Sequence, residues 1–203
     1  PDPIDIVLID DSSEDGTADR ARSLGFRVIS PPQPVGLTAG WNRAYAEFIG
    51  NPAYEALFIV NNDIVFPRNT FTRMADVLAG IEGPAVVGPM TTKHGLGKVS
   101  MQPLTSLQPP PELLAGLPDT TAAVDDYVVS KSKPPHHVRT QWLLGYCMGV
   151  DRDMGDGGSF SETELFDPAN RVVGQEDDLF STRRIPAYAA TNVFVYHMKG
   201  ATL

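Results

Sequence analysis

Acidic side chains and one histidine follow three apolar segments of the chain, each at the point where a strand is expected to end. Asp10 and Asp11 follow IVLI, Asp63 follows LFIVNN, and His197 follows VFVY. In an open α/β sheet, ligands bind in the crevice at the carboxyl ends of the strands. If these strands run parallel, the acidic ends face one crevice. An anion could bind there through a metal ion, backbone amides or a few basic residues.

Each of these residues also has an ordinary structural explanation. The segment DDSSEDGT, which contains Asp10 and Asp11, suits a turn or the N-cap of a helix. Asp63 precedes no obvious turn, and a carboxylate flanked by apolar residues is costly to bury without a partner. A single histidine such as His197 is more often an ordinary surface or core residue. The joint pattern favours a site more than any one member does.

A further acidic cluster, Glu176-Asp177-Asp178, opens the segment EDDLFSTRRI. A positioned carboxylate that acts as general acid or base contributes about 10²–10⁴-fold to a reaction rate. Three adjacent acids repel one another, so such a cluster can supply a base for proton transfer. The alternative is an acidic first turn that only complements the dipole of a helix.

The composition limits the function classes. The chain has 203 residues, enough for one α/β domain with a real core. A net charge of −9 argues against a nucleic-acid-binding surface. No apolar run approaches the roughly 20 residues of a membrane span. Cys147 is the only cysteine, so an intrachain disulfide is impossible, and we expect a reducing compartment, the cytoplasm.

The elements that must position these residues alternate along the first half of the chain. Apolar, β-branched segments predict strands, and amphipathic segments between them predict helices. The predicted strands are 4–10, 26–30, 56–60 and 85–90, and the predicted helices are 17–24, 37–49 and 70–78. This alternation predicts an α/β fold with a mostly parallel sheet and right-handed crossovers.

The second half of the chain lacks this regular alternation of predicted strands and helices. Residues 93–140 are rich in Pro and Gly, which predicts a loop-rich region. A strand pair, or a strand and a turn, is expected in 141–150, a helix in 176–185 and a last strand in 192–197.

Six segments in this order resemble those of one enzyme family, and the last of them, VYH, is similar to the family's closing strand. IVLIDDSSEDGT is similar to the family's VVDDgStDgT segment, PVGLTAGWNRAY to its glycine-and-asparagine helix start, and FIVNNDIVF to a reduced Asp-x-Asp motif. GSFSE and EDDLFSTR are similar to its Gly-Phe-Asp-Glu turn and its acidic helix that ends in Arg. The chain thus resembles the inverting nucleotide-sugar glycosyltransferases of family 2, which build glycans and have the GT-A fold, a Rossmann-like α/β architecture.

The resemblance implies a nucleoside-diphosphate sugar as donor and a glycan or other hydroxyl compound as acceptor. Asp63 and His197 would bind Mn²⁺ or Mg²⁺, although Asn61 replaces an acid that the family often has. The family's general base falls on Asp177, and which of Glu176, Asp177 and Asp178 faces the acceptor stays open. The residues that would contact the nucleotide sugar are Asp10, Asp11, Gly36, Asn42, Asn62, Arg183 and Lys199. Arg183 could instead have a purely structural role, as the partner of the acidic residues at the start of its own helix.

The resemblance also implies a division of the chain. Residues 1–92 would form the nucleotide-binding half and 93–203 the acceptor and catalytic half of a single domain. The family's domain normally starts one strand and helix earlier, so we expect an upstream segment in the natural protein. The motifs NNDI and AGWN resemble those of the rhamnosyltransferase-type members of this family. The alternatives are a non-catalytic sugar- or nucleotide-binding domain of the same fold and a nucleotidyltransferase.

Overall fold

A mixed five-stranded sheet forms the centre of the computed structural model, which describes residues 4–91, 109–170 and 177–198. The strand order is β3 (Ala56–Val60), β7 (Cys147–Asp151), β5 (Val86–Met90), β8 (Ala187–Phe194) and β6 (His137–Thr140). β5 and β8 are parallel, whereas β7 runs antiparallel to β3 and β5, and β6 runs antiparallel to β8. The predicted α/β class is therefore confirmed, but the sheet is mixed because β6 and β7 from the second half enter it antiparallel.

Two small sheets lie outside the central one. β1 (Val7–Ile9) and β2 (Arg27–Ile29) pair in parallel, and α1 (Thr17–Ser23) connects them. β4 (Ile64–Val65) and β9 (Tyr196–His197) pair antiparallel, with Ile64 opposite His197. The pairing of β4 with β9 brings residues 64–65 beside residues 196–197, near the end of the described chain.

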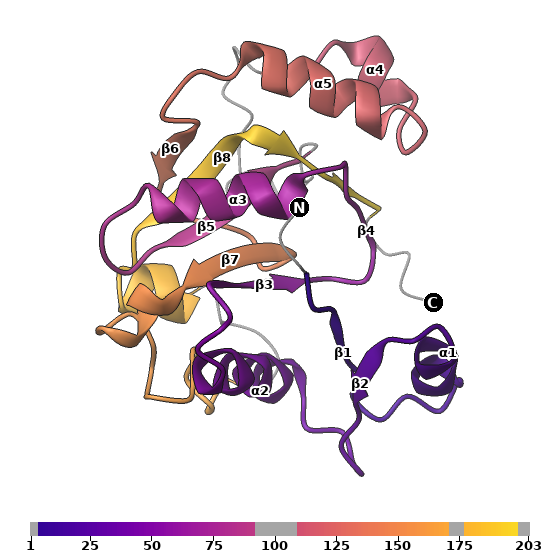
Figure 1. Ribbon diagram of the computed structural model, residues 1–203, viewed down its shortest axis with the longest axis vertical. Coiled ribbons are helices and arrows are strands. Elements are labelled where there is room, and N and C mark those ends of the chain that lie inside the picture. Colours follow the sequence, from indigo (N-terminus) through magenta and orange to yellow (C-terminus); the bar gives the residue numbers. More distant parts are fainter. Residues whose placement is uncertain (1–3, 92–108, 171–176, 199–203) are drawn as a thin grey trace.

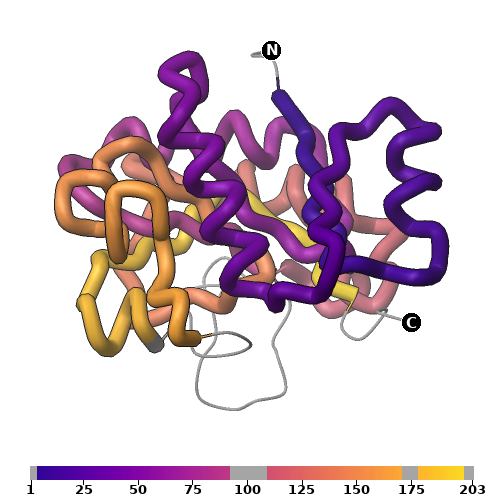
Figure 2. The backbone as a smooth tube through the Cα atoms, turned by 90° about the horizontal axis from the view of Figure 1, so that it is seen from below, coloured from indigo at the N-terminus to yellow at the C-terminus, as the bar shows by residue number. Residues whose placement is uncertain are grey.

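Helices cover the central sheet. α3 (Thr70–Ala79) packs on β5, β7 and β8, and α2 (Leu37–Gly50) packs beside β3, below the sheet in Figure 1. Figure 2 shows α2 between the β1–α1–β2 segment on one side and the orange 150–170 segment on the other. α2 is thus placed to hold both segments in position.

The region predicted to be loop-rich contains regular structure. It holds α4 (Pro111–Ala115), α5 (Thr121–Lys131) and β6, and only residues 92–108 lie outside the described part. Val124 and Val128 of α5 are fully buried against Met90 and Phe194, in a second core cluster beside β8. The prediction of little periodic structure here was wrong because a long-range partner stabilises α5: Arg73 of α3 binds Asp125.

Of the remaining elements, the 3₁₀ helix at 152–155 was not predicted, and the others overlap predicted segments. Residues 152–155 form the 3₁₀ helix η2 (Arg152–Gly155), and the expected helix in 176–185 is the π-helix η3 (Asp177–Thr182). The last predicted strand is divided between β8 and β9. None of the helices in the described ranges is long and apolar enough to cross a membrane.

Candidate active site

The turn after β1 is tied to the start of α2 through Asp11. Its carboxylate accepts hydrogen bonds from the backbone N–H groups of Val35, at 2.7 Å, and Gly36, at 3.0 Å. Gly36 has φ +87°, a left-handed conformation that glycine adopts without strain. The two motifs that carry Asp11 and Gly36 are therefore in direct contact. Asp11 is exposed, and each of its carboxylate oxygens has a second lone pair available to a ligand.

The neighbouring Asp10 is buried and holds the turn together. Its carboxylate accepts hydrogen bonds from the Ser30 hydroxyl, at 2.6 Å, and from the Ser13 backbone N–H, at 3.3 Å. The hydrogen bond from Ser30 has the largest effect on Asp10. Together the two bonds lower the pKa of Asp10 because they favour its charged form. Asp10 therefore supports the turn, as its predicted role requires.

Ser30→Ala is expected to destabilise the protein in a pH-dependent way. Because the pKa of Asp10 is lower in the folded than in the unfolded state, its contribution is present above the unfolded value and is lost as the pH falls through the folded value. The free energy of unfolding should fall by about 1 kcal/mol at pH 7, and the loss should shrink below about pH 4. Urea denaturation at pH 7 and pH 3 measures both.

Ser23→Ala is the matched control for this experiment. The Ser23 hydroxyl donates to the backbone carbonyl of Arg20, which does not titrate, so its removal should have the same effect at both pH values. A loss for Ser30→Ala that is equal at pH 7 and pH 3 would contradict the assignment.

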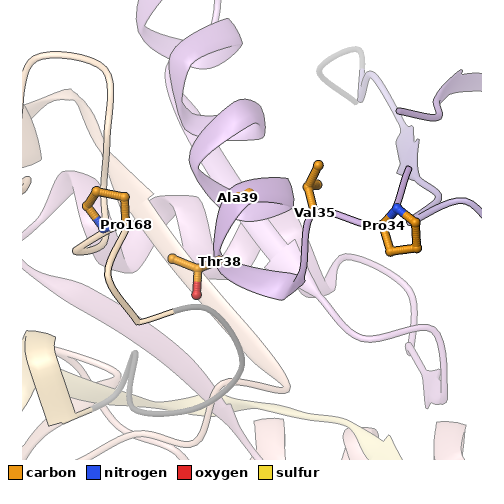
Figure 3. Close-up of a pocket in the computed structure, with 5 residues that line it drawn as sticks. All are labelled: Pro34, Val35, Thr38, Ala39 and Pro168. Atoms are coloured by element: carbon orange, nitrogen blue, oxygen red, sulfur yellow. The ribbon is translucent and has the colours of Figure 1, made fainter. Parts of the chain in front are cut away.

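A shallow pocket of about 350 Å³ lies beside this turn, where α2 begins. It is lined by Pro34, Val35, Thr38, Ala39 and Pro168 (Figure 3). The Thr38 hydroxyl donates to the backbone carbonyl of Asn170, so the first turn of α2 is attached to the 167–170 loop. The pocket is therefore bounded by two distant segments that a hydrogen bond holds together.

Asn42 makes a second attachment of α2 to the same loop. Its amide nitrogen donates to the carbonyl of Phe166, and its amide oxygen accepts from the Phe166 N–H, each at 2.9 Å. The Trp41 and Phe166 rings also pack together, with centroids 5.3 Å apart. These contacts give the buried Asn42 a structural function in the described residues, and its predicted contact with a nucleotide sugar stays a prediction.

Asp63 and His197 lie in direct contact, although 134 residues separate them. The His197 Nε2 atom is 3.0 Å from one Asp63 carboxylate oxygen and 3.1 Å from the other. The contact is shielded, with side-chain exposures of 13% for His197 and 10% for Asp63. The Met198 N–H also donates to the Asp63 carbonyl, at 2.9 Å, and reinforces the pairing of β4 with β9.

This pair has the chemistry of a partial metal site. The Asp63 carboxylate is buried, and both of its oxygens lie within 3.1 Å of the His197 Nε2 atom. A carboxylate oxygen and an imidazole nitrogen are suitable ligands for Mn²⁺, and Mg²⁺ is commonly held by one or two carboxylates plus substrate phosphates. Within the described ranges, no group of three or more metal-binding side chains occurs. Asp63 and His197 therefore fit a cation that a bound diphosphate would also coordinate.

The π-helix η3 places Asp178 inside the protein. The Asp178 carboxylate accepts hydrogen bonds from the Arg183 guanidinium, at 2.5 Å, and from the backbone N–H of Asp167, at 3.3 Å. π-helical turns are rare and often occur at functional sites. Only 8% of the Asp178 side chain is exposed, and its predicted catalytic role stays a prediction.

Arg183 joins η3 to the preceding loop. Besides Asp178, its guanidinium donates to the carbonyl oxygens of Gly158 and Leu165, both at 2.7 Å. Pairing with the acidic helix start is thus observed, and it takes place in the interior of the protein. A contact between Arg183 and a diphosphate stays a prediction.

The other predicted site residues are less defined. Asn62 is exposed between β3 and β4. The backbone of Asp177 begins η3, whereas Glu176 and Lys199 lie outside the described residues. The structure therefore brings Asp63 into contact with His197. Asp11 is bonded to the residues that precede α2, and Asp178 is bonded to Asp167 in the loop that α2 contacts. Sequence reasoning missed Tyr146, whose ring stacks on His197; nothing in its sequence position distinguishes it from a core residue.

Comparison with known proteins agrees with this architecture. The family model described as glycosyl transferase family 2 matches residues 1–128. No curated protein matches the chain. Among solved structures, the chain is similar to the crystal structure of GalNAc-T7 with UDP, GalNAc and Mn²⁺, with 13% identity and a TM-score of 0.63. The match covers 95% of this chain and 37% of that one. At this identity the likeness concerns the fold alone, and the predicted GT-A-like fold is confirmed.

Proposed function

This chain belongs to glycosyl transferase family 2, and on that premise we propose that it transfers a sugar from a nucleoside-diphosphate sugar to an acceptor hydroxyl. The reaction proceeds with inversion at the anomeric carbon. Asp177 is the general base, Asp63 and His197 hold Mn²⁺ or Mg²⁺, and Asp11 contacts the nucleotide base.

The observation that carries this proposal is the contact between Asp63 and His197. A carboxylate with only 10% of its side chain exposed is costly to bury unless a partner compensates it. The imidazole 3.0 Å away supplies a second ligand of the right chemistry. That UDP and Mn²⁺ are bound in GalNAc-T7, a protein of similar fold, supports the choice of Mn²⁺ and of UDP as first probes.

The residues divide the work of the reaction. The acceptor hydroxyl attacks the anomeric carbon from the face opposite the diphosphate, and the Asp177 carboxylate takes its proton as the new bond forms. A divalent cation, when bound, neutralises the charge that develops on the departing diphosphate. The buried pair of Asp178 and Arg183 keeps the start of η3 attached to the 158–167 loop, so that Asp177 is held on a fixed element.

Asp63→Asn tests the metal assignment. We expect it to weaken Mn²⁺ binding in the presence of UDP by more than about tenfold, because even residues that only support a metal ligand change affinity by 10–100-fold. The substitution keeps the shape of the side chain and removes its charge. Isothermal titration with Mn²⁺ and UDP measures the change.

Asp76→Asn, an exposed substitution on α3, is the control for this titration and should bind Mn²⁺ as the wild type does. Equal Mn²⁺ affinity in the wild type and Asp63→Asn would rule out the proposed metal site. A thermal-shift screen of UDP, GDP and dTDP sugars with Mn²⁺ then identifies the donor. We expect the rhamnose donors to be among those that bind.

A non-catalytic sugar- or nucleotide-binding domain is the second candidate. Asn61 stands where the family often has an acid, and the described part of the chain has no third metal-binding side chain near Asp63 and His197. Both features favour weaker metal binding. Donor binding without hydrolysis or transfer would support this candidate over the enzyme.

A further inference from the structure

Tyr146 contacts both of the segments that carry the Asp63–His197 pair. It directly precedes β7, and its backbone carbonyl accepts a hydrogen bond from the N–H of Asn61, at 2.8 Å. Asn61 is two residues before Asp63. The side chain of Tyr146 points to the other partner, because its ring stacks on the His197 imidazole with centroids 5.0 Å apart and an interplanar angle of 27°.

The tyrosine is itself fixed in place. Its side chain is part of the main core, and the residue is 3% exposed. Its hydroxyl donates to the backbone carbonyl of Pro89, at 3.1 Å, so both ends of the side chain are anchored. A ring held in this way is a rigid wall for the group that stacks on it.

His197, by contrast, is carried by a short element. β9 has two residues, and its described pairing is with the equally short β4. The backbone alone therefore constrains the imidazole weakly. A tilt of the imidazole out of its plane would drive its edge into the Tyr146 ring, so the stack restrains the ring plane, and within that plane the contact with Asp63 is made by Nε2.

We propose that Tyr146 is a positioning residue that sets the orientation of His197 toward Asp63 and toward the cation they hold, an inference that rests on the proposed function. The contact is made by the ring face, so the aromatic ring is required and the hydroxyl contributes only to anchoring. Groups that orient a metal ligand typically change metal affinity by 10–100-fold when removed, and stacking without a hydrogen bond belongs at the lower end of that range.

Tyr146→Leu and Tyr146→Phe test this role. In the presence of UDP, Tyr146→Leu should bind Mn²⁺ about 3–10-fold more weakly, whereas Tyr146→Phe should stay within about twofold of the wild type. In the metal-free protein, the ring protons of His197 should show an upfield ring-current shift by NMR. The shift should persist in Tyr146→Phe and disappear in Tyr146→Leu.

Tyr188→Leu is the matched control, because Tyr188 makes an edge-on contact with another histidine, His137, at 5.3 Å between centroids. It should leave Mn²⁺ affinity and the His197 signals unchanged. If Tyr146→Leu does not fold, as judged by circular dichroism, Tyr146→Met replaces it, since a flexible Met fills irregular space.

The outcomes separate the inference from its premise. Unchanged Mn²⁺ affinity or unchanged His197 ring shifts on removal of the Tyr146 ring would overturn the inference alone. A wild-type protein that binds no Mn²⁺ with UDP would overturn the proposed function and this inference with it.

Discussion

Asp177→Asn is expected to lower kcat for sugar transfer by about 10²–10⁴-fold and to leave donor binding unchanged. The amide has the shape of the carboxylate but cannot take the proton of the acceptor hydroxyl. Of the acidic residues at the start of η3, Asp178 is buried and bound to Arg183, and this favours Asp177 as the base. Steady-state kinetics with the identified donor, and titration of that donor, measure the two effects separately.

Asp126→Asn is the matched control, an exposed carboxylate on α5 away from the proposed site, and it should retain wild-type kinetics. Activity of Asp177→Asn within about tenfold of the wild type would move the base to another residue. Glu176 is then the next variant to make, because it is the remaining member of the acidic cluster.

Removal of one partner from the Asp178–Arg183 pair is expected to cost about 3–5 kcal/mol of the free energy of unfolding, because it leaves an uncompensated buried charge. The side chains are 8% and 16% exposed, and the joining hydrogen bond is 2.5 Å long. Arg183→Met also removes the bonds to the Gly158 and Leu165 carbonyls, so its effect should be at least as large as that of Asp178→Asn. Urea denaturation of both variants measures this.

The exposed pair of Arg27 and Glu47 is the control for burial. These side chains are 55% and 30% exposed, so Arg27→Met should cost no more than about 1 kcal/mol. The experiment also tests the assignment of the base. If Asp178→Asn folds as stably as the wild type but loses transfer by more than about 10²-fold, Asp178 and not Asp177 takes the proton.

The first half of the fold could be predicted closely from local pattern. The strand expected at 56–60 is β3, and the helices expected at 17–24, 37–49 and 70–78 differ from α1, α2 and α3 by no more than a residue at either end. These segments have clear apolar periodicity and are bounded by Gly, Pro or Asn. Turns and periodicity depend on neighbouring residues, so a single sequence carries them.

The second half could not be predicted as well, because its stability depends on distant partners. α5 carries an acid, Asp125, on its buried side, where an amphipathic pattern would require an apolar residue. Asp125 is tolerated there because Arg73 of α3 binds both of its oxygens, at 2.8 and 2.9 Å. Arg73 is 52 residues away along the chain, so the residues around Asp125 give no indication of this ion pair.

The candidate site divides in the same way. The polar residue types at or just after the ends of β1, β3 and β9 were sufficient to predict a polar site, and the order of the motifs was sufficient to predict the family. The tertiary structure alone decided that His197 contacts Asp63 and that Asp178 turns inward to Arg183. The reason is physical: both contacts depend on which strands and loops pack side by side, and that packing is set by burial across the whole chain, not by spacing along it.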